Sequence, residues 1–195
     1  MNFILLLIFG YLLGSISFGY LIPKLKRIDI RKIGSKSTSS TNVSRALGWK
    51  WGVLSGILDF LKGVIPAYLA INYLQNSWQI AAVLVAPVAG HIFPIWFGFK
   101  GGRGAATVLG VLIVLLGWNF VYILIPWIFI LATIKVMSFA NLVLAVFLPA
   151  VFFTFSPSIP YLTCGIILFL LIWWALRENI KRIKEGVEPK IKFKW

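Results

Sequence analysis

The sequence has few of the residues that most enzymes use for acid–base, thiol or metal chemistry. It contains one His, one Cys and five acidic residues among 195. The lone Cys164 has no partner in the chain for a disulfide, and the lone His91 does not support a His-based metal site. Nothing indicates a Ser-His-Asp triad, because His91 lies in an apolar segment and the acids are few. We therefore expect neither a metal nor a cofactor.

Charged residues are also scarce, at 12% of the chain, whereas 60% of the residues are hydrophobic and the mean hydropathy is +0.93. One soluble core cannot hide that much apolar surface, which predicts an integral membrane protein. The net charge of +14 would suggest nucleic acid binding in a soluble domain. Here the basic residues lie between long apolar runs, so we expect membrane lipid as a partner and no nucleic acid.

Apolar stretches near the length of a bilayer span predict an all-α fold of about seven transmembrane helices in a single domain, residues 1–195. The first run lacks a positive segment before it and a cleavage site after it, so we expect it to be retained. Gly117-Trp118-Asn119 is the only plausible turn in the longest apolar run. The predicted spans are roughly 2–23, 51–74, 79–97, 104–118, 119–136, 139–155 and 159–176.

Basic and uncharged connections alternate along the chain. The connections at 75–78, 117–119 and 156–158 have no charged residue. Because cytoplasmic loops collect Lys and Arg, seven spans place the N-terminus outside and the C-terminus, with its basic tail 177–195, in the cytoplasm. Five spans would keep both ends in place but leave Lys135 unexplained. The basic residues of the other connections are Lys24, Lys26, Arg27, Arg31, Lys32, Lys36, Arg45 and Lys50, then Lys100 and Arg103, then Lys135, and finally Arg177, Lys181, Arg182, Lys184, Lys190, Lys192 and Lys194.

Lys62 is the exception, because it lies about three turns into the second predicted span. Asp59 precedes it by three residues, and at that spacing the two side chains share a helix face and can pair. Pairing reduces the cost of placing ionised groups near hydrocarbon. We interpret the pair as an internal clasp, and the alternative is that it supports a polar site in the cytoplasmic half.

The first cytoplasmic loop contains "GSKSTSSTNVSRALG", from Gly34 to Gly48. It interleaves hydroxyls, an amide and cations, which are the groups that bind phosphate. The order of residues is not that of a Walker A loop. A solvated loop whose Lys and Arg contact lipid head groups is the alternative interpretation.

The second cytoplasmic loop adds "GHIFPIWFGFKGGRGAATVLG", from Gly90 to Gly110. Its glycines around Arg103 permit close approach of the backbone to a ligand, with amides pointing outward. A helix that begins at Ala105 would add its free N–H groups and its dipole. His91 is either a structural residue of the span or a participant in chemistry.

Four polar clusters thus meet at one membrane face, because Lys135, Ser138 and Asn141 form a third, and Arg177, Glu178, Asn179 and Arg182 a fourth. A site that is rich in cations and hydroxyls but poor in bases is suited to binding phosphates and stabilising negative charge. It favours the transfer of a group that is already activated.

The order of several motifs resembles that of the bacterial membrane-integral acyl-phosphate:glycerol-3-phosphate acyltransferase family. The motifs are "LLGSISFGYL", "GSKSTSSTNVSRALG", "LDFLKG", "GHIFPIWFGFKGGRGAAT" and "RENIKRIKEGVE", which span most of the chain. The resemblance implies seven spans and a cytoplasm-facing site in the bacterial cytoplasmic (inner) membrane. It also implies transfer of an acyl group from acyl phosphate to the 1-hydroxyl of glycerol 3-phosphate, giving lysophosphatidic acid and phosphate. The donor would link the protein to the enzyme that makes acyl phosphate.

The resemblance implies roles for residues of all four clusters. The residues implied in catalysis are Ser35, Ser138 and Asn179. Those implied in binding substrate phosphates are Ser35, Asn42, Arg45, Lys100, Gly101, Gly102, Arg103 and Gly104. Asp59, Lys62 and His91 would support the site.

The chain departs from the family pattern at several polar positions. Ser37, Ser39 and Ser40 stand in a loop where the family has glycines and a further Asn. Arg103 and Leu176 stand where the family usually has Lys and His. The departures keep two rival hypotheses open: a catalytically weak protein that binds lipid phosphates or acts as a scaffold, and a transporter of a phosphorylated solute.

Overall fold

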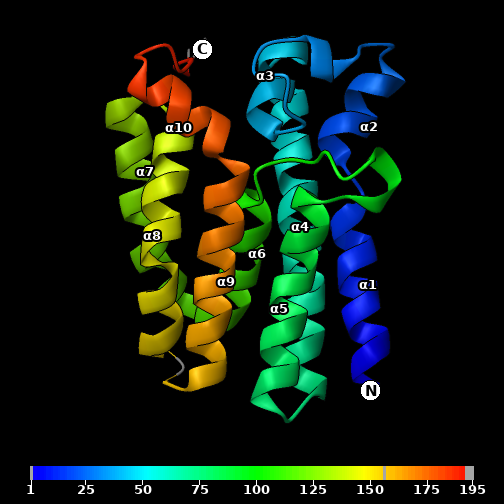
Figure 1. Cartoon of the computed structure of the whole chain (residues 1–195), viewed down its shortest axis with the longest axis vertical. Helices are drawn as coiled ribbons and strands as arrows, with labels where there is room; N and C mark the ends of the chain where they lie inside the picture. The colour runs from blue at the N-terminus through cyan, green and yellow to red at the C-terminus, as the bar shows by residue number, and fades with distance from the viewer. Residues whose placement is uncertain (1, 156, 192–195) are drawn as a thin grey trace.

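The computed structural model describes residues 2–155 and 157–191, and these residues form helices and loops without a strand (Figure 1). The α-helices are α1 (Phe3–Ser15), α2 (Phe18–Leu25), α3 (Ser40–Leu47), α4 (Trp49–Tyr73), α5 (Ser77–Ile92), α6 (Ala105–Leu116), α7 (Val121–Ile134), α8 (Met137–Phe155), α9 (Ile159–Ala175) and α10 (Arg177–Lys184). Short 3-10 helices are η1 (Ile30–Lys32), η2 (Ile95–Phe97) and η3 (Gly117–Phe120).

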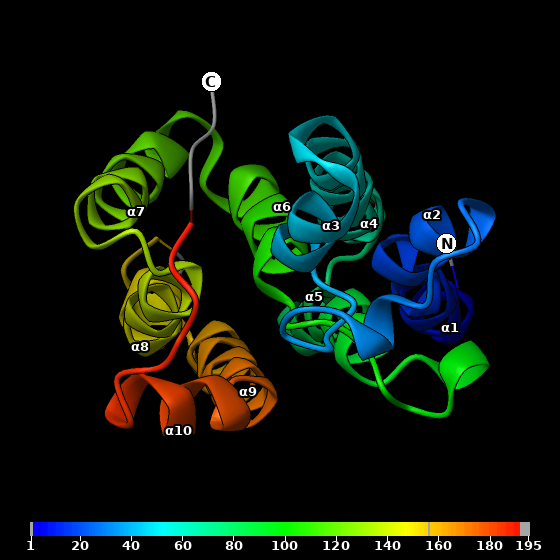
Figure 2. The same cartoon turned by 90° about the horizontal axis from the view of Figure 1, so that it is seen from above.

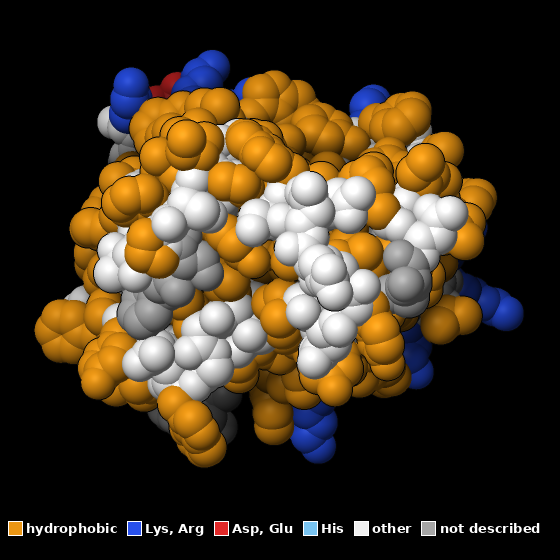
Figure 3. Space-filling view, turned by 90° about the horizontal axis from the view of Figure 1, so that it is seen from below, with side chains coloured by type: hydrophobic (Ala, Val, Ile, Leu, Met, Phe, Trp, Pro, Cys, Tyr) orange, Lys and Arg blue, Asp and Glu red, His pale blue; other side chains and the backbone are white. Residues whose placement is uncertain are grey.

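The long helices run along one axis as a bundle, and the short helices α3 and α10 gather at the end where the chain finishes (Figure 1). We call this the polar end, because the basic loops that the sequence assigns to one side lie here. The opposite end shows hydrophobic and uncharged side chains, with Lys and Arg visible only at the rim (Figure 3). The predicted separation of basic from uncharged connections is therefore present in the fold.

Glycines let the helices approach closely at two crossings. A Cβ on Gly90 of α5 would collide with the carbonyl oxygen of Tyr11 in α1. A Cβ on Gly110 of α6 would collide with that of Phe60 in α4. Small residues at such contacts allow backbones to pack against each other without a hydrophobic driving force between the helices, as in membrane bundles.

The first predicted span is a bent pair of helices rather than one rod. Ile16 and Ser17 are extended between α1 and α2, which meet at 41°. The carbonyl oxygens that the break leaves without helical partners accept hydrogen bonds from Lys62 of α4. Lys62 Nζ lies 3.0 Å from the Gly14 oxygen and 2.7 Å from the Ile16 oxygen. Hydropathy is continuous through this region, so it gave no signal for the break.

The longest apolar run, Ala105–Ile134, divides at the predicted turn. Gly117 has a φ of +54°, a conformation that favours glycine, and it begins η3. The chain reverses there, so that α6 and α7 run in opposite directions (Figure 1).

Pro94 shortens α5 relative to the predicted span 79–97. The helix ends at Ile92, since the residue before a proline is pushed out of the helical region. The chain then forms η2 and a loop that returns toward the bundle.

Within the described residues, four helical segments are long and apolar enough to cross a bilayer by themselves. By length and composition they are Trp49–Tyr73, Ser77–Phe97, Ala105–Ile134 and Met137–Thr154, and the third contains both α6 and α7 with the reversal at η3 between them. The bent pairs α1–α2 and α9–α10 raise the number to six if each pair is one span.

Candidate functional site

A cavity of about 110 Å³ opens among the segments of the polar end, onto which Figure 2 looks. It is several times larger than the ~30 Å³ that one water molecule occupies in the liquid. The segments that line it come from both termini and from the middle of the chain. Its lining residues are Ser35, Ser37, Ser39, Ser40, Thr41, Arg45, Asp59, His91, Arg103, Gly104, Ala105, Ala106, Leu109, Trp127, Met137, Ser138, Asn141, Leu176, Asn179, Glu188 and Pro189.

The loop before α3 is organised by Asn42, whose side chain is fully buried. Asn42 Oδ1 accepts a hydrogen bond from the Ser35 amide at 3.1 Å. Its Nδ2 lies 3.0 Å from the Ile33 oxygen and 2.9 Å from the Ser37 oxygen, with the Ile30 oxygen at 3.3 Å. The amide is thus engaged by the backbone and lies outside the cavity wall, beneath the loop that forms it.

A row of serine hydroxyls covers this loop on the cavity side. Ser35 Oγ and Ser37 Oγ are 2.9 Å apart, and Ser37 Oγ and Ser39 Oγ are 3.0 Å apart. Ser39 Oγ also caps α3, because it accepts a hydrogen bond from the backbone N–H of Asn42. Because each hydroxyl can donate and accept, the row can turn its protons toward an anion in the cavity.

Arg45 follows on α3 and reaches across the cavity to the C-terminal tail. Its Nη2 donates to the Pro189 carbonyl oxygen at 3.1 Å. Burial lowers the pKa of the Arg45 guanidinium, while the carboxylate of Glu188 raises it and the charge of Arg182 lowers it.

Glu188 joins the opposite wall of the cavity into one network. Ser138 Oγ and Asn179 Nδ2 donate to its Oε1 at 2.8 and 2.6 Å, and Arg182 Nε donates to its Oε2 at 2.7 Å. The carboxylate of the tail therefore joins α8 and α10. Sequence reasoning assigned no site role to Glu188, which is one of three acidic residues in the basic tail 177–195.

Arg103 contributes a second cation, which is partly buried, and its Nη1 donates to the Ala175 oxygen at the end of α9. Its Nε has no hydrogen-bond partner among the described residues. Burial lowers the pKa of Arg103 to about 10, and the charge of Arg182 also lowers it, while Glu188 raises it. The guanidinium is still cationic at neutral pH.

The glycines beside Arg103 have a different role from the expected one. The amides of Gly101 and Gly102 do not point outward; they donate to the carbonyl oxygens of Ile92 and His91, each at 3.1 Å. Gly102 also leaves room for the His91 ring, with which a Cβ would collide. These two glycines fix the loop against α5, and they do not line the cavity.

Gly104 and the first turn of α6 bring backbone donors to the cavity. Gly104 has a φ of +79° and precedes α6 without any side-chain cap. Ala105 and Ala106 line the cavity at this helix start. The uncapped amides and the positive end of the helix dipole favour an anion here.

Asp59, Lys62 and His91 form a buried polar group between α4 and α5. The predicted pair is confirmed, since Lys62 Nζ lies 2.9 Å from Asp59 Oδ1 and both side chains are buried. Lys62 Nζ is also 3.0 Å from His91 Nδ1. Thr107 donates to the Asp59 carbonyl oxygen at 3.0 Å, which ties the group to α6.

The cavity also has an apolar side, formed by Leu109, Trp127, Met137 and Leu176. Trp127 directs its Nε1–H to Asn141 Oδ1 at 3.1 Å. A molecule with an anionic head and a hydrocarbon chain fits such a mixture of walls.

The structure thus gathers most of the predicted site residues around one cavity. Those in the wall are Ser35, Arg45, Asp59, His91, Arg103, Gly104, Ser138 and Asn179. Asn42, Lys62, Gly101 and Gly102 lie behind it, and Lys100 is exposed on the loop outside it. In residues 2–155 and 157–191, no group of three or more His, Cys, Asp or Glu side chains is placed to hold a metal ion.

Comparisons with known proteins agree on one family. The model of the family described as glycerol-3-phosphate acyltransferase matches residues 4–186. Proteins of that name from Aquifex aeolicus and Maridesulfovibrio salexigens are 41% and 40% identical, over 97% and 100% of this chain and 100% of each relative. The crystal structure of PlsY, described as an integral membrane glycerol 3-phosphate acyltransferase, is 39% identical in its glycerol 3-phosphate form, with a TM-score of 0.94 over 98% of this chain and 96% of that one. Its lysophosphatidic acid form gives 38% and 0.90 over the same shares.

Proposed function

The chain belongs to the glycerol-3-phosphate acyltransferase family, and we propose that its acyl donor is an acyl phosphate. It is an acyltransferase of phospholipid biosynthesis that acylates glycerol 3-phosphate to lysophosphatidic acid. The observation that best supports an acyl phosphate donor is the meeting of two arginines, a row of hydroxyls and an apolar wall in one cavity. Both substrates would carry a phosphate, and the donor would also carry a hydrocarbon chain.

The phosphates would be held by Ser35, Arg45, Arg103 and the start of α6 at Gly104. Charge-assisted hydrogen bonds from arginine are among the strongest that a phosphate can receive. Ser138 and Asn179, which now donate to Glu188, would complete the pocket around the reacting groups. Asn42, Gly101 and Gly102 would act indirectly, by fixing the loops that carry these donors. Lys100 would attract substrate phosphate from outside the cavity wall.

The reaction needs little from a protein base. An acyl phosphate is a mixed anhydride with a good leaving group, so positioning and neutralisation of charge supply much of the acceleration. Among the carboxylates of the wall, Glu188 already accepts three hydrogen bonds and Asp59 is paired with Lys62. A phosphate oxygen of a substrate would therefore take the proton of the attacking hydroxyl.

The protein would cross the bacterial cytoplasmic membrane as a seven-span bundle. The crossings would be α1–α2, α4, α5, α6, α7, α8 and α9, since the chain reverses at η3. The basic polar end would face the cytoplasm and the N-terminus the outside. The loop from Gly98 to Gly104 would be tolerated near the bilayer because Gly101 and Gly102 bind the end of α5 and Arg103 and Gly104 line the cavity.

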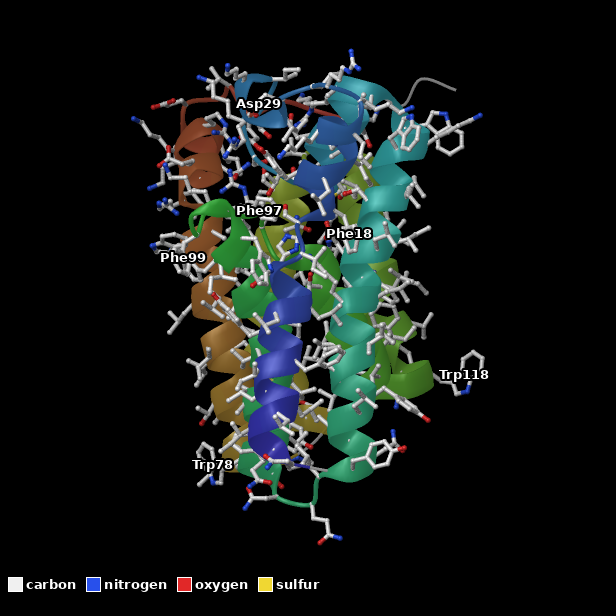
Figure 4. The ribbon with its side chains drawn as sticks, turned by 90° about the vertical axis from the view of Figure 1, so that its right-hand side faces the viewer. Phe18, Asp29, Trp78, Phe97, Phe99 and Trp118 are labelled. Carbon is white, nitrogen blue, oxygen red and sulfur yellow. The ribbon has the colours of Figure 1, made fainter. Side chains whose placement is uncertain are left out.

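Exposed aromatic side chains support this placement. Trp78 extends outward near the end opposite the polar end, and Trp118 extends outward at a level between those of Phe99 and Trp78 (Figure 4). Trp118 is 97% exposed, so a partner inside the protein does not explain it. Exposed tryptophans are typical of the interfacial region of a bilayer.

A direct comparison of donors tests the proposal. Purified protein in lipid vesicles would be given glycerol 3-phosphate with acyl phosphate, acyl-CoA or acyl carrier protein. We expect lysophosphatidic acid and inorganic phosphate from the acyl phosphate alone, with phosphate release dependent on glycerol 3-phosphate. Equal or faster transfer from another donor would refute the assignment. Binding of both phosphates without turnover would support a catalytically weak lipid-phosphate binder instead.

A further inference from the structure

His91 lines the cavity together with polar and apolar residues. Arg103 and Gly104 are among its polar lining, and Leu109 and Trp127 are among its apolar lining. Leu109 follows Ala105 by one helical turn, on the same face of α6. In an acyl phosphate, the carbonyl group joins the phosphate to the hydrocarbon chain. A donor bound in this cavity would place its carbonyl group between the two kinds of lining, and His91 is a polar lining residue that could reach it.

Lys62 fixes which nitrogen of the His91 ring carries a proton. An ammonium has three protons to donate. Lys62 Nζ has three hydrogen-bond acceptors: the Gly14 oxygen at 3.0 Å, the Ile16 oxygen at 2.7 Å and His91 Nδ1 at 3.0 Å. Asp59 Oδ1 is a fourth neighbour of the ammonium, at 2.9 Å. Because an ammonium has no lone pair, a proton on His91 Nδ1 would face Lys62 Nζ at 3.0 Å without an acceptor. His91 Nδ1 is thus an acceptor and carries no proton.

The rest of the ring agrees with this state. Asp59 Oδ1 is 3.6 Å from His91 Nδ1, which is too far for a hydrogen bond. A neutral imidazole without a proton on Nδ1 carries it on Nε2. Within the described part of the chain, Nε2 has no hydrogen-bond partner, and Gly102 has no side chain to cover it. The group offers a free N–H donor in the cavity wall.

We propose that His91 is a catalytic hydrogen-bond donor, whose Nε2–H binds the carbonyl oxygen of the acyl group as that oxygen gains negative charge. The proposal rests on acyl transfer from acyl phosphate. The hydroxyl oxygen of glycerol 3-phosphate forms a bond to the carbonyl carbon, the π pair moves to the carbonyl oxygen, and a phosphate oxygen takes the hydroxyl proton. The pair returns as the bond from that carbon to the leaving phosphate breaks. His91 is neutral throughout.

The tautomer can be measured without any assay of activity. The chain has one His, so protein labelled with [15N]histidine and purified without a histidine tag gives one signal for each ring nitrogen. We expect an unprotonated Nδ1 and a protonated Nε2 in lipid vesicles at neutral pH. A proton on Nδ1, alone or together with one on Nε2, would overturn the proposal.

Two substitutions separate the catalytic role from a structural one. His91→Asn retains an acceptor near the Nδ1 position for Lys62 but has no group at Nε2, whereas His91→Gln supplies an amide donor near Nε2. We expect His91→Asn to lower kcat by about 100- to 1000-fold, the usual loss for one such donor, and His91→Gln to recover part of it. The KM for glycerol 3-phosphate should change little. If His91 only anchors Lys62, the order of kcat reverses, and His91→Asn is the more active variant.

Controls keep this outcome distinct from a failure of the proposed function. Gln79→Asn shortens a polar side chain in the first turn of the same helix and should leave kcat unchanged. Wild-type activity with a fully active His91→Asn variant would refute only the role of His91. Absence of lysophosphatidic acid from the wild type would refute the proposed donor, while the tautomer would still be decided by the nitrogen signals.

Discussion

The two walls of the cavity are organised in different ways. In the wall before α3, one neutral amide, Asn42, binds the backbone of its own loop within 12 residues of chain. In the wall formed by α8, α10 and the tail, one carboxylate, Glu188, receives donors from as far as 50 residues away. The first wall is a local fold that presents hydroxyls, and the second is a charge network closed by tertiary structure. The two walls should therefore respond differently to substitution.

The largest effect is expected from Glu188→Ala. It removes the counter-charge that Arg182, Arg45 and Arg103 share and leaves the Ser138 and Asn179 donors without their acceptor, and each buried group left unsatisfied costs about 1–3 kcal/mol. We expect kcat/KM for glycerol 3-phosphate to fall about 100-fold, with a lower melting temperature. Glu185→Ala, at an exposed position of the same tail, should change neither. Wild-type kinetics in Glu188→Ala would show that the second wall needs no carboxylate.

Asn42→Ala should have the next largest effect, through geometry rather than charge. The Ser35 amide and up to three carbonyls lose their partner, and each buried group left unsatisfied costs about 1–3 kcal/mol. Because the loop would no longer hold Ser35 and Arg45 in place, we expect KM for glycerol 3-phosphate to rise about tenfold. Asn72→Ala, on an exposed face of α4, is the matched control. An unchanged KM would mean that the loop is ordered without Asn42.

Gly102→Ala tests the contact between Gly102 and the His91 ring. The added Cβ collides with His91 Nε2, and overpacking of this kind costs about 1–3 kcal/mol. We expect a roughly tenfold loss of kcat with a smaller change in KM. Gly56→Ala meets only Ser40 atoms at 3.6 Å or more, so it should be neutral. Equal kinetics for the two variants would show that the contact between Gly102 and His91 does not affect the reaction.

The smallest effect is expected at Asp29, a carboxylate outside the cavity at the polar end (Figure 4). The Arg31 amide lowers the pKa of Asp29 below 3.8, so the folded-state pKa is depressed. Its stabilisation is therefore present above pH 3.8 and is lost as pH falls through the folded pKa. We expect Asp29→Asn to shift the melting temperature by about 2 °C or less at pH 7. The difference from wild type should shrink in acid; a difference that grew in acid would contradict this sign.

The sequence predicted the site best where polar residues were placed by topology. The alternation of basic and uncharged connections correctly put Ser35, Arg103, Ser138 and Asn179 at one end of the bundle. The three-residue spacing of Asp59 and Lys62 correctly predicted their pairing. Both inferences depend only on helix periodicity and on which side of the bundle a loop lies.

Other features depend on contacts that no local pattern records. Glu188 closes over Ser138 across 50 residues, and Lys62 satisfies carbonyls at a helix break 46 and 48 residues away. Gly101 and Gly102 looked like an anion nest, but their amides bind the end of α5. In each case the hydrogen-bond partner is chosen by packing rather than by neighbouring sequence.

Arg45 and Arg103, both of which line the cavity, are the central residues of the proposed phosphate site. The most direct test measures acyl-phosphate-dependent formation of lysophosphatidic acid by Arg45→Ala and Arg103→Ala, together with the affinity of each for glycerol 3-phosphate. Arg177→Ala, an exposed arginine stacked on Trp174 at the same end, is the control. We predict that both cavity variants lose at least about tenfold in kcat/KM, as expected when a charged hydrogen bond is removed, while the control retains wild-type values. Turnover that survives either cavity substitution with unaltered affinity would contradict the assignment of the cavity as the phosphate site.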